Sequence, residues 1–110
     1  MTADGWRDEL TAIVRLYAGG RATGDDVFAF AARVWDVEGD ASESQGVFVV
    51  RQLLCVAGQA TVDEDQAVFD ATRELIDLCP EADRQANSAG QFLTAFANVR
   101  QSGAAVQDCL

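Results

Sequence analysis

The sequence predicts a single all-α domain, an antiparallel bundle of four or five helices. The length of 110 residues is that of one domain. Hydrophobic residues make up 49% of the chain and charged residues 24%, the balance of a globular protein with a buried core. Apolar residues also recur at helical spacing along most of the chain. The domain is expected to span residues 1–110, with 102–110 as a frayed tail.

The N-terminal part of the chain predicts a helical hairpin. A first helix over Asp4–Ala18 ends at the glycine pair 19–20, because glycine readily adopts the left-handed conformation. Thr23 then caps a second helix, with Asp26 three residues later as an acidic variant of the capping box. Phe30 falls outside the apolar stripe of this helix, which makes it the candidate for an exposed apolar anchor. The two predicted apolar faces comprise Trp6, Leu10, Ile13, Val14 and Tyr17, and Val27, Phe28, Ala31, Val34 and Trp35.

A polar loop over residues 36–46 precedes the most apolar part of the chain. The segment Val47–Ala60 is hydrophobic on nearly every side, which is typical of the central helix of a bundle. Residues 47–50 are strand formers, so a buried strand is the alternative. We prefer the helix because the apolar run is longer than an ordinary strand.

The C-terminal half predicts two more helical segments. Thr61 and Glu64 match the S/T-x-x-E capping box, which opens a helix that runs to Leu78. Pro80 ends that helix, and the segment Glu81–Arg100 is helical with a break near Asn87, Ser88 and Gly90. The residues expected to face the core are Val68, Ala71, Leu75, Leu78, Phe92, Leu93, Phe96 and Val99.

The charge of the chain is strongly negative. There are 18 Asp and Glu against 8 basic residues, giving a net charge of −10 at pH 7, and His is absent. This balance argues against a nucleic-acid-binding protein and favours a basic protein partner. Without His, a Ser or Cys nucleophile lacks its usual general base. The sequence therefore predicts a protein that is not an enzyme, has no catalytic residues and needs no cofactor.

Cysteine usage and the N-terminus indicate a cytoplasmic protein. Cys55, Cys79 and Cys109 are an odd number of widely spaced thiols, which is typical of a reducing compartment, and Cys55 is expected in the core. The first ten residues lack a signal-peptide pattern, and no apolar run is long enough to span a membrane. The D-x-E-x-D sequence at 36–40 resembles a calcium loop, but Ala41 and Val47 occupy two of its defining positions. No metal site is predicted.

The acidic residues are concentrated in two blocks. Residues 23–45 carry a net charge of −5 and residues 61–83 a net charge of −7. Solvated helix faces and first-turn carboxylates account for most of them. Asp36, Glu38 and Asp40 are different, since they are expected to follow the C-terminal end of a helix, where the helix dipole disfavours negative charge. This position suggests that another molecule uses these carboxylates.

The segment Leu16–Trp35 carries the one resemblance to a known family. Tyr17, Gly20, Thr23, Phe28 and Trp35 form a helix end, a glycine turn, a cap and an aromatic helix. This hairpin resembles the N-terminal hairpin of small bacterial immunity proteins of the colicin D type. The resemblance implies an acidic helical inhibitor that binds a nuclease toxin and presents carboxylates in place of RNA phosphates.

The function expected from the sequence is therefore that of an immunity or antitoxin protein. Its partner would be a cognate basic nuclease toxin, with no binding to nucleic acid or membrane. The alternative is an acidic helical adaptor, a regulatory subunit, or a nucleic-acid mimic of the anti-CRISPR or anti-restriction type. The gene beside this one distinguishes the two. The candidate partner-binding residues are Asp36, Glu38, Asp40 and Glu43, followed by Asp63, Glu64 and Asp65.

Overall fold

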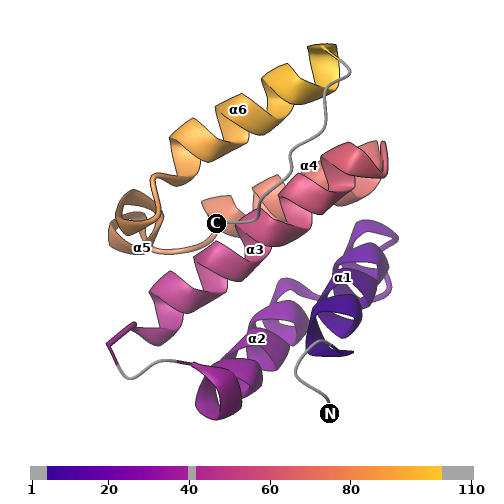
Figure 1. The fold of residues 1–110 in the computed structure, drawn as a ribbon. Helices are drawn as coiled ribbons and strands as arrows, with labels where there is room; N and C mark the ends of the chain where they lie inside the picture. The colour runs from indigo at the N-terminus through magenta and orange to yellow at the C-terminus, as the bar shows by residue number, and fades with distance from the viewer. Residues whose placement is uncertain (1–4, 40–41, 103–110) are drawn as a thin grey trace.

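The computed structural model describes residues 5–39 and 42–102, and these residues form six helices (Figure 1). The helices are α1 (Gly5–Ala18), α2 (Gly24–Glu38), α3 (Gln45–Val62), α4 (Gln66–Asp77), α5 (Glu81–Ala86) and α6 (Ala89–Ser102). The all-α prediction is confirmed. The sixth helix arises because the predicted break near residue 87 separates the short α5 from α6. Of the tail predicted at 102–110, Ser102 is the last residue of α6 and residues 103–110 lie outside the described part of the chain.

The central helix of the fold is α3 (Figure 1). It packs against α2, α4, α5 and α6, whereas α1 packs against α2 and α4. Residues 47–50 are helical, so the preference for helix over strand is confirmed. Buried residues occur all around the helix, which explains why its sequence shows no polar face. They include Phe48, Val49, Val50, Leu53, Leu54, Val56, Ala57 and Ala60.

The hairpin of α1 and α2 forms as its sequence predicts. Gly20 has a φ of +75°, and the N–H groups of Gly20 and Arg21 donate to the carbonyls of Tyr17 and Leu16. This is the Schellman arrangement, which satisfies carbonyls left free at a helix end. Thr23 and Asp26 complete the predicted capping box: each side chain accepts a hydrogen bond from the other residue's backbone N–H.

Phe30 is a core residue, so the prediction of an exposed anchor was wrong. Only 5% of its surface is exposed. The buried positions of α2 are 27, 30, 31 and 34, the i, i+3, i+4, i+7 pattern of one helix face. Phe28 and Trp35, which the sequence analysis placed on that stripe, are half-buried along its edge.

The predicted capping box at Thr61 and Glu64 does not exist. Thr61 lies inside α3, where its buried hydroxyl donates to the carbonyl of Gly58. The helix ends instead in a second Schellman turn, with Glu64 at a φ of +56° and the N–H of Asp65 donating to Ala60. Asp65 is the N-cap of α4, and its side chain accepts from the N–H of Val68.

The remaining helices follow the prediction with one exception. Val68, Ala71 and Leu75 of α4 are buried, but Leu78 is 62% exposed because it caps the end of the helix. Leu93 and Phe96 of α6 are buried and Phe92 is half-buried, while the side chain of Val99 lies outside the described part. No helix in the described ranges is long and apolar enough to span a membrane.

Candidate functional site

The acidic residues expected to follow α2 are placed differently from the prediction. Asp36 and Glu38 belong to the last turn of α2 itself. Asp36 is exposed. The side chain of Glu38 and the whole of Asp40 lie outside the described residues. The prediction that Asp36 and Glu38 follow the helix was wrong, because the apolar pattern ends at Trp35 while the backbone helix continues to Glu38.

Glu43 has a structural role rather than an exposed one. Its carboxylate accepts two hydrogen bonds from the Arg51 guanidinium, at 2.9 and 2.8 Å, and 16% of its side chain is exposed. Its backbone carbonyl also accepts a hydrogen bond from the indole N–H of Trp35. These contacts hold the α2–α3 connection against both helices. The charge of Glu43 is neutralised within the protein, so it is a poor candidate for partner binding.

The acidic residues 63–65 form the turn between α3 and α4. Asp63 caps the C-terminal end of α3 and accepts a hydrogen bond from the Gln59 side chain. Glu64 is exposed, whereas Asp65 is half-buried and lies 3.5 Å from the Arg15 guanidinium. The sequence predicted that Asp63 lies in the first turn of a helix that begins at Thr61. This prediction was wrong, because Asp63 lies at the C-terminal end of α3.

The two predicted acidic groups do not form one site. They lie at opposite ends of α3, which has 18 residues. At 1.5 Å per residue this helix is about 27 Å long. Figure 1 shows the α2–α3 connection and the α3–α4 turn at opposite ends of the molecule.

Other exposed carboxylates lie at the start of α2 and along α4, and we call this group the α2–α4 acidic face. It comprises Asp25, Asp26, Asp70, Glu74 and Asp77, all of them exposed. The start of α2 packs on the second half of α4, since a Cβ added to Gly24 would lie 3.6 Å from Leu75 Cδ2 and 3.7 Å from Leu78 Cδ1. Residues 70, 74 and 77 follow helical spacing along one side of α4. Arg21 and Arg73 are the basic residues nearest to this face in the sequence.

Tyr17 of α1 joins the acidic face through Glu74. Its hydroxyl donates a hydrogen bond to Glu74 Oε1 at 2.9 Å. The pKa of Tyr17 is raised above its usual value of 10.0, first by desolvation and then by the hydrogen bond and the negative charge of Glu74. Tyr17 therefore stays protonated and holds the Glu74 carboxylate in position at neutral pH.

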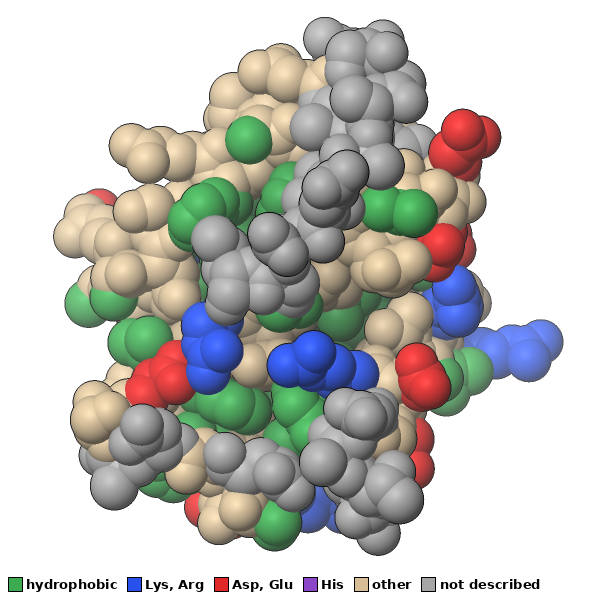
Figure 2. All heavy atoms as spheres, viewed as in Figure 1, with side chains coloured by type: hydrophobic (Ala, Val, Ile, Leu, Met, Phe, Trp, Pro, Cys, Tyr) green, Lys and Arg blue, Asp and Glu red, His purple; other side chains and the backbone are tan. Residues whose placement is uncertain are grey.

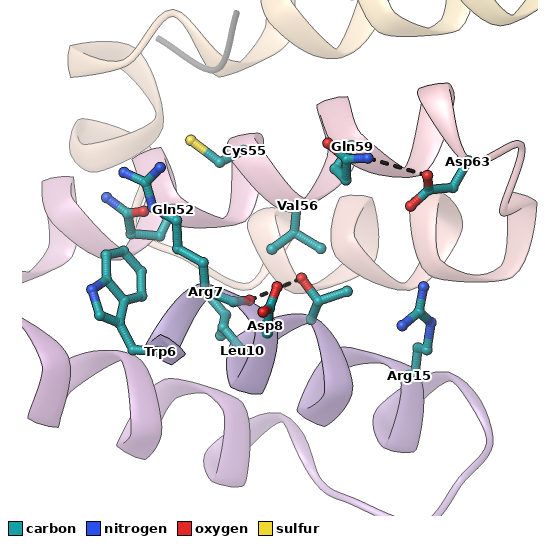
Figure 3. Close-up of a pocket in the computed structure, with 11 residues that line it drawn as sticks. Trp6, Arg7, Asp8, Leu10, Arg15, Gln52, Cys55, Val56, Gln59 and Asp63 are labelled. Atoms are coloured by element: carbon teal, nitrogen blue, oxygen red, sulfur yellow. Dashed lines mark hydrogen bonds between the residues drawn. The ribbon is translucent and has the colours of Figure 1, made fainter. Parts of the chain in front are cut away.

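A groove of about 490 Å³ lies between α1 and α3 (Figure 3). Trp6, Arg7 and Gln52 lie at one end, and Arg15, Gln59 and Asp63 lie at the other. The remaining lining residues are Asp8, Leu10, Thr11, Cys55 and Val56. Figure 2 shows basic side chains both near the centre and at the right edge of the viewed face, with acidic side chains beside them. The sequence does not indicate this groove, because the residues that line its two walls are more than 30 positions apart.

The thiols and carboxylates do not form a reactive centre in the described part of the chain. Cys79 is the free cysteine there, and burial raises its pKa from 9.0 to about 11, with Asp83 adding to the shift and Arg84 opposing it. Cys55 is half-buried rather than in the core, and it is disulfide-bonded rather than the free thiol expected from the sequence; Cys109 lies outside the described residues. No group of three or more Cys, Asp or Glu among the described residues is placed to hold a metal ion.

No family model, curated protein or solved structure matches the chain. The function therefore has to be argued from the site itself.

Proposed function

We propose that this protein is a non-catalytic inhibitor that binds a basic nuclease toxin through its α2–α4 acidic face. The observation that carries the proposal is the presence of five exposed carboxylates at the start of α2 and along α4, two segments that approach each other at Gly24. A basic nuclease cleft binds the phosphates of RNA, and clustered carboxylates present the same charge. The resemblance of the hairpin at Leu16–Trp35 suggests the same function, that of an acidic helical immunity protein.

The charges of this face are available to a partner. The two ion pairs within the described residues are Arg15–Asp65 and Arg51–Glu43, and both lie elsewhere. Asp26 and Glu74 accept hydrogen bonds from neutral donors, the Thr23 backbone N–H and the Tyr17 hydroxyl. A net charge of −10 adds a long-range attraction toward basic proteins.

The chemistry of the chain supports binding rather than catalysis. It contains no His, and the free thiol of Cys79 is buried with a raised pKa, so little of it is thiolate at neutral pH. Exposed carboxylates on a helix pair offer a surface for salt bridges. Among the residues predicted from sequence, Asp36, Asp63 and Glu64 are exposed but lie near the two ends of α3, outside the α2–α4 acidic face.

The proposal predicts a basic nuclease encoded beside this chain's gene, and co-expression of the two proteins tests it. The wild-type protein should copurify with the nuclease and restore growth. The triple variant Asp25→Asn, Asp70→Asn and Asp77→Asn should lose most of that protection while folding normally, because all three side chains are exposed. A matched control, Asp36→Asn, Asp63→Asn and Glu64→Gln, removes the same charge elsewhere and should still protect. Protection that survives the first triple variant would contradict the proposal.

A further inference from the structure

We propose that the α1–α3 groove binds a ligand in which a carboxylate lies beside an amide N–H. An N-acyl amino acid and the C-terminal residue of a peptide share this chemistry. The site lies between α1 and α3, whereas the acidic face lies on α2 and α4, so this inference does not depend on the proposed toxin partner.

The first observation is the buried side chain of Gln52. The residue is 3% exposed and lines the groove, and its Oε1 atom has no hydrogen-bond partner in the described part of the chain. Leaving a buried amide oxygen without a donor is costly, and native structures rarely do so without a reason. A ligand N–H that reaches this oxygen would satisfy it.

The second observation is the presence of arginines in the groove. Arg7 and Arg15 line it together with Asp8 and Asp63, in a chain that has 8 basic residues and a net charge of −10. Arg15 already faces Asp65 at 3.5 Å. The Arg7 guanidinium is instead held over the Trp6 ring, 5.2 Å from its centre, at the same end of the groove as Gln52 (Figure 3). Arg7 is thus placed to bind a carboxylate close to the Gln52 oxygen.

The third observation is the apolar wall beside these two polar groups. Trp6, Leu10 and Val56 line the groove, and each is buried in the core on its other side. A volume of about 490 Å³ falls within the range of small-molecule sites. An acceptor, a cation and an apolar wall match the N–H, carboxylate and aliphatic side chain of an acylated amino acid such as N-acetyl-leucine.

A titration followed by ¹H–¹⁵N NMR tests the ligand chemistry. N-acetyl-L-leucine should bind saturably, with shifts concentrated at the Trp6 indole and the Gln52 side-chain amide. N-acetyl-leucinamide lacks the carboxylate and 4-methylpentanoate lacks the N–H, so each should bind about tenfold more weakly. A tripeptide that ends in leucine, compared with its C-terminally amidated form, distinguishes the two sources. Tighter binding of the tripeptide than of N-acetyl-leucine identifies a peptide terminus, and similar affinity identifies the free acid.

Two variants assign the binding to the groove. Arg7→Gln should weaken N-acetyl-leucine binding about tenfold. Gln52→Leu should have an effect of the same size, because it replaces the buried hydrogen-bond acceptor with an apolar side chain of similar length. Arg7 is exposed, so its replacement keeps the fold even where Gln52→Leu does not. Arg21→Gln removes the same charge from the α1–α2 turn and should leave the affinity unchanged. Absence of saturable binding, or equal affinity in the wild type and Arg7→Gln, would overturn the proposal.

Discussion

At the scale of single residues, two helix ends with the same geometry use different amino acids. Gly20 ends α1 and Glu64 ends α3, and both lie at left-handed φ values, +75° and +56°. The hydrogen bonds of the two turns correspond, from Arg21 to Leu16 and from Asp65 to Ala60. A residue with a Cβ is strained in this conformation by about 1 kcal/mol, and glycine is not.

Glycine at position 64 should therefore stabilise the protein. We expect Glu64→Gly to raise the free energy of unfolding by about 0.5–1 kcal/mol, and Gly20→Ala to lower it by about 1 kcal/mol. Urea denaturation at pH 7 measures both. Glu64→Ala is the control, since it removes the charge but keeps the Cβ, and it should stay near the wild type. A stabilisation by Glu64→Ala as large as that by Glu64→Gly would assign the effect to charge instead.

Cys79 should make the protein sensitive to alkaline pH. Its pKa rises from 9.0 to about 11 in the folded state, so the folded protein holds the thiol proton more tightly than the unfolded chain. The corresponding stability is fully present below pH 9 and is lost as the pH rises toward 11. At most it amounts to about 2–3 kcal/mol.

Replacing Cys79 should remove the part of the stability loss at alkaline pH that comes from its thiol. Cys79→Ala should cost about 1 kcal/mol at pH 7 because it shortens a buried side chain, and its unfolding free energy should then fall less than that of the wild type between pH 8.5 and 10.5. Denaturant titrations at the two pH values give the difference. Equal losses in the two proteins would show that Cys79 does not titrate as its burial implies.

At the scale of elements, the connection between α2 and α3 is anchored by one paired carboxylate. Glu43 binds Arg51 through two hydrogen bonds and receives the Trp35 indole N–H at its carbonyl. The Arg51 guanidinium also lies 5.5 Å from the centre of the Phe48 ring. Together these contacts fix where α3 starts relative to α2. Pairs of this kind are worth more than exposed ion pairs because both groups are partly desolvated.

Breaking this pair should cost stability and leave partner binding intact. Glu43→Gln should lower the free energy of unfolding by about 1–2 kcal/mol, and a double-mutant cycle with Arg51→Gln should give a coupling above about 0.5 kcal/mol. The comparison is Arg15→Gln, which breaks the more exposed pair with Asp65 and should cost less than about 1 kcal/mol. A coupling near zero would mean that the α2–α3 connection does not depend on Glu43.

The sequence predicted the helices well and their ends less well. Periodicity identifies α1 to α4 because each must bury an apolar face, and that requirement is local. The pattern at Thr61 and Glu64 wrongly predicted a helix start, because S/T-x-x-E also occurs where a helix continues, as α3 does through Thr61. The prediction for Phe30 was wrong because it centred the buried face of α2 on Phe28 and Trp35, which are only half-buried. Whether a helix ends at Trp35 or at Glu38 depends on tertiary contacts such as that between Trp35 and Glu43.

At the scale of the whole molecule, the charge pattern separates two surfaces. The α2–α4 face gathers carboxylates from both acidic blocks of the sequence, and the α1–α3 groove carries arginines beside a buried amide. Neither surface follows from sequence spacing. The start of α2 approaches the end of α4 at Gly24, beside Leu75 and Leu78, although the two segments are about 50 residues apart in the sequence. The candidate residues expected from sequence lie instead at the two ends of α3, about 27 Å apart.

The rate of association with the cognate basic nuclease tests the α2–α4 acidic face most directly. Stopped-flow measurements over a range of salt concentrations would compare three proteins of known charge. The Asp25→Asn, Asp70→Asn and Asp77→Asn variant should associate about tenfold more slowly than the wild type at low salt, with a weaker salt dependence. The Asp36→Asn, Asp63→Asn and Glu64→Gln variant carries the same net charge and should remain within about threefold of the wild type. Equal slowing of the two variants, or slowing of the second alone, would contradict the assignment of binding to this face.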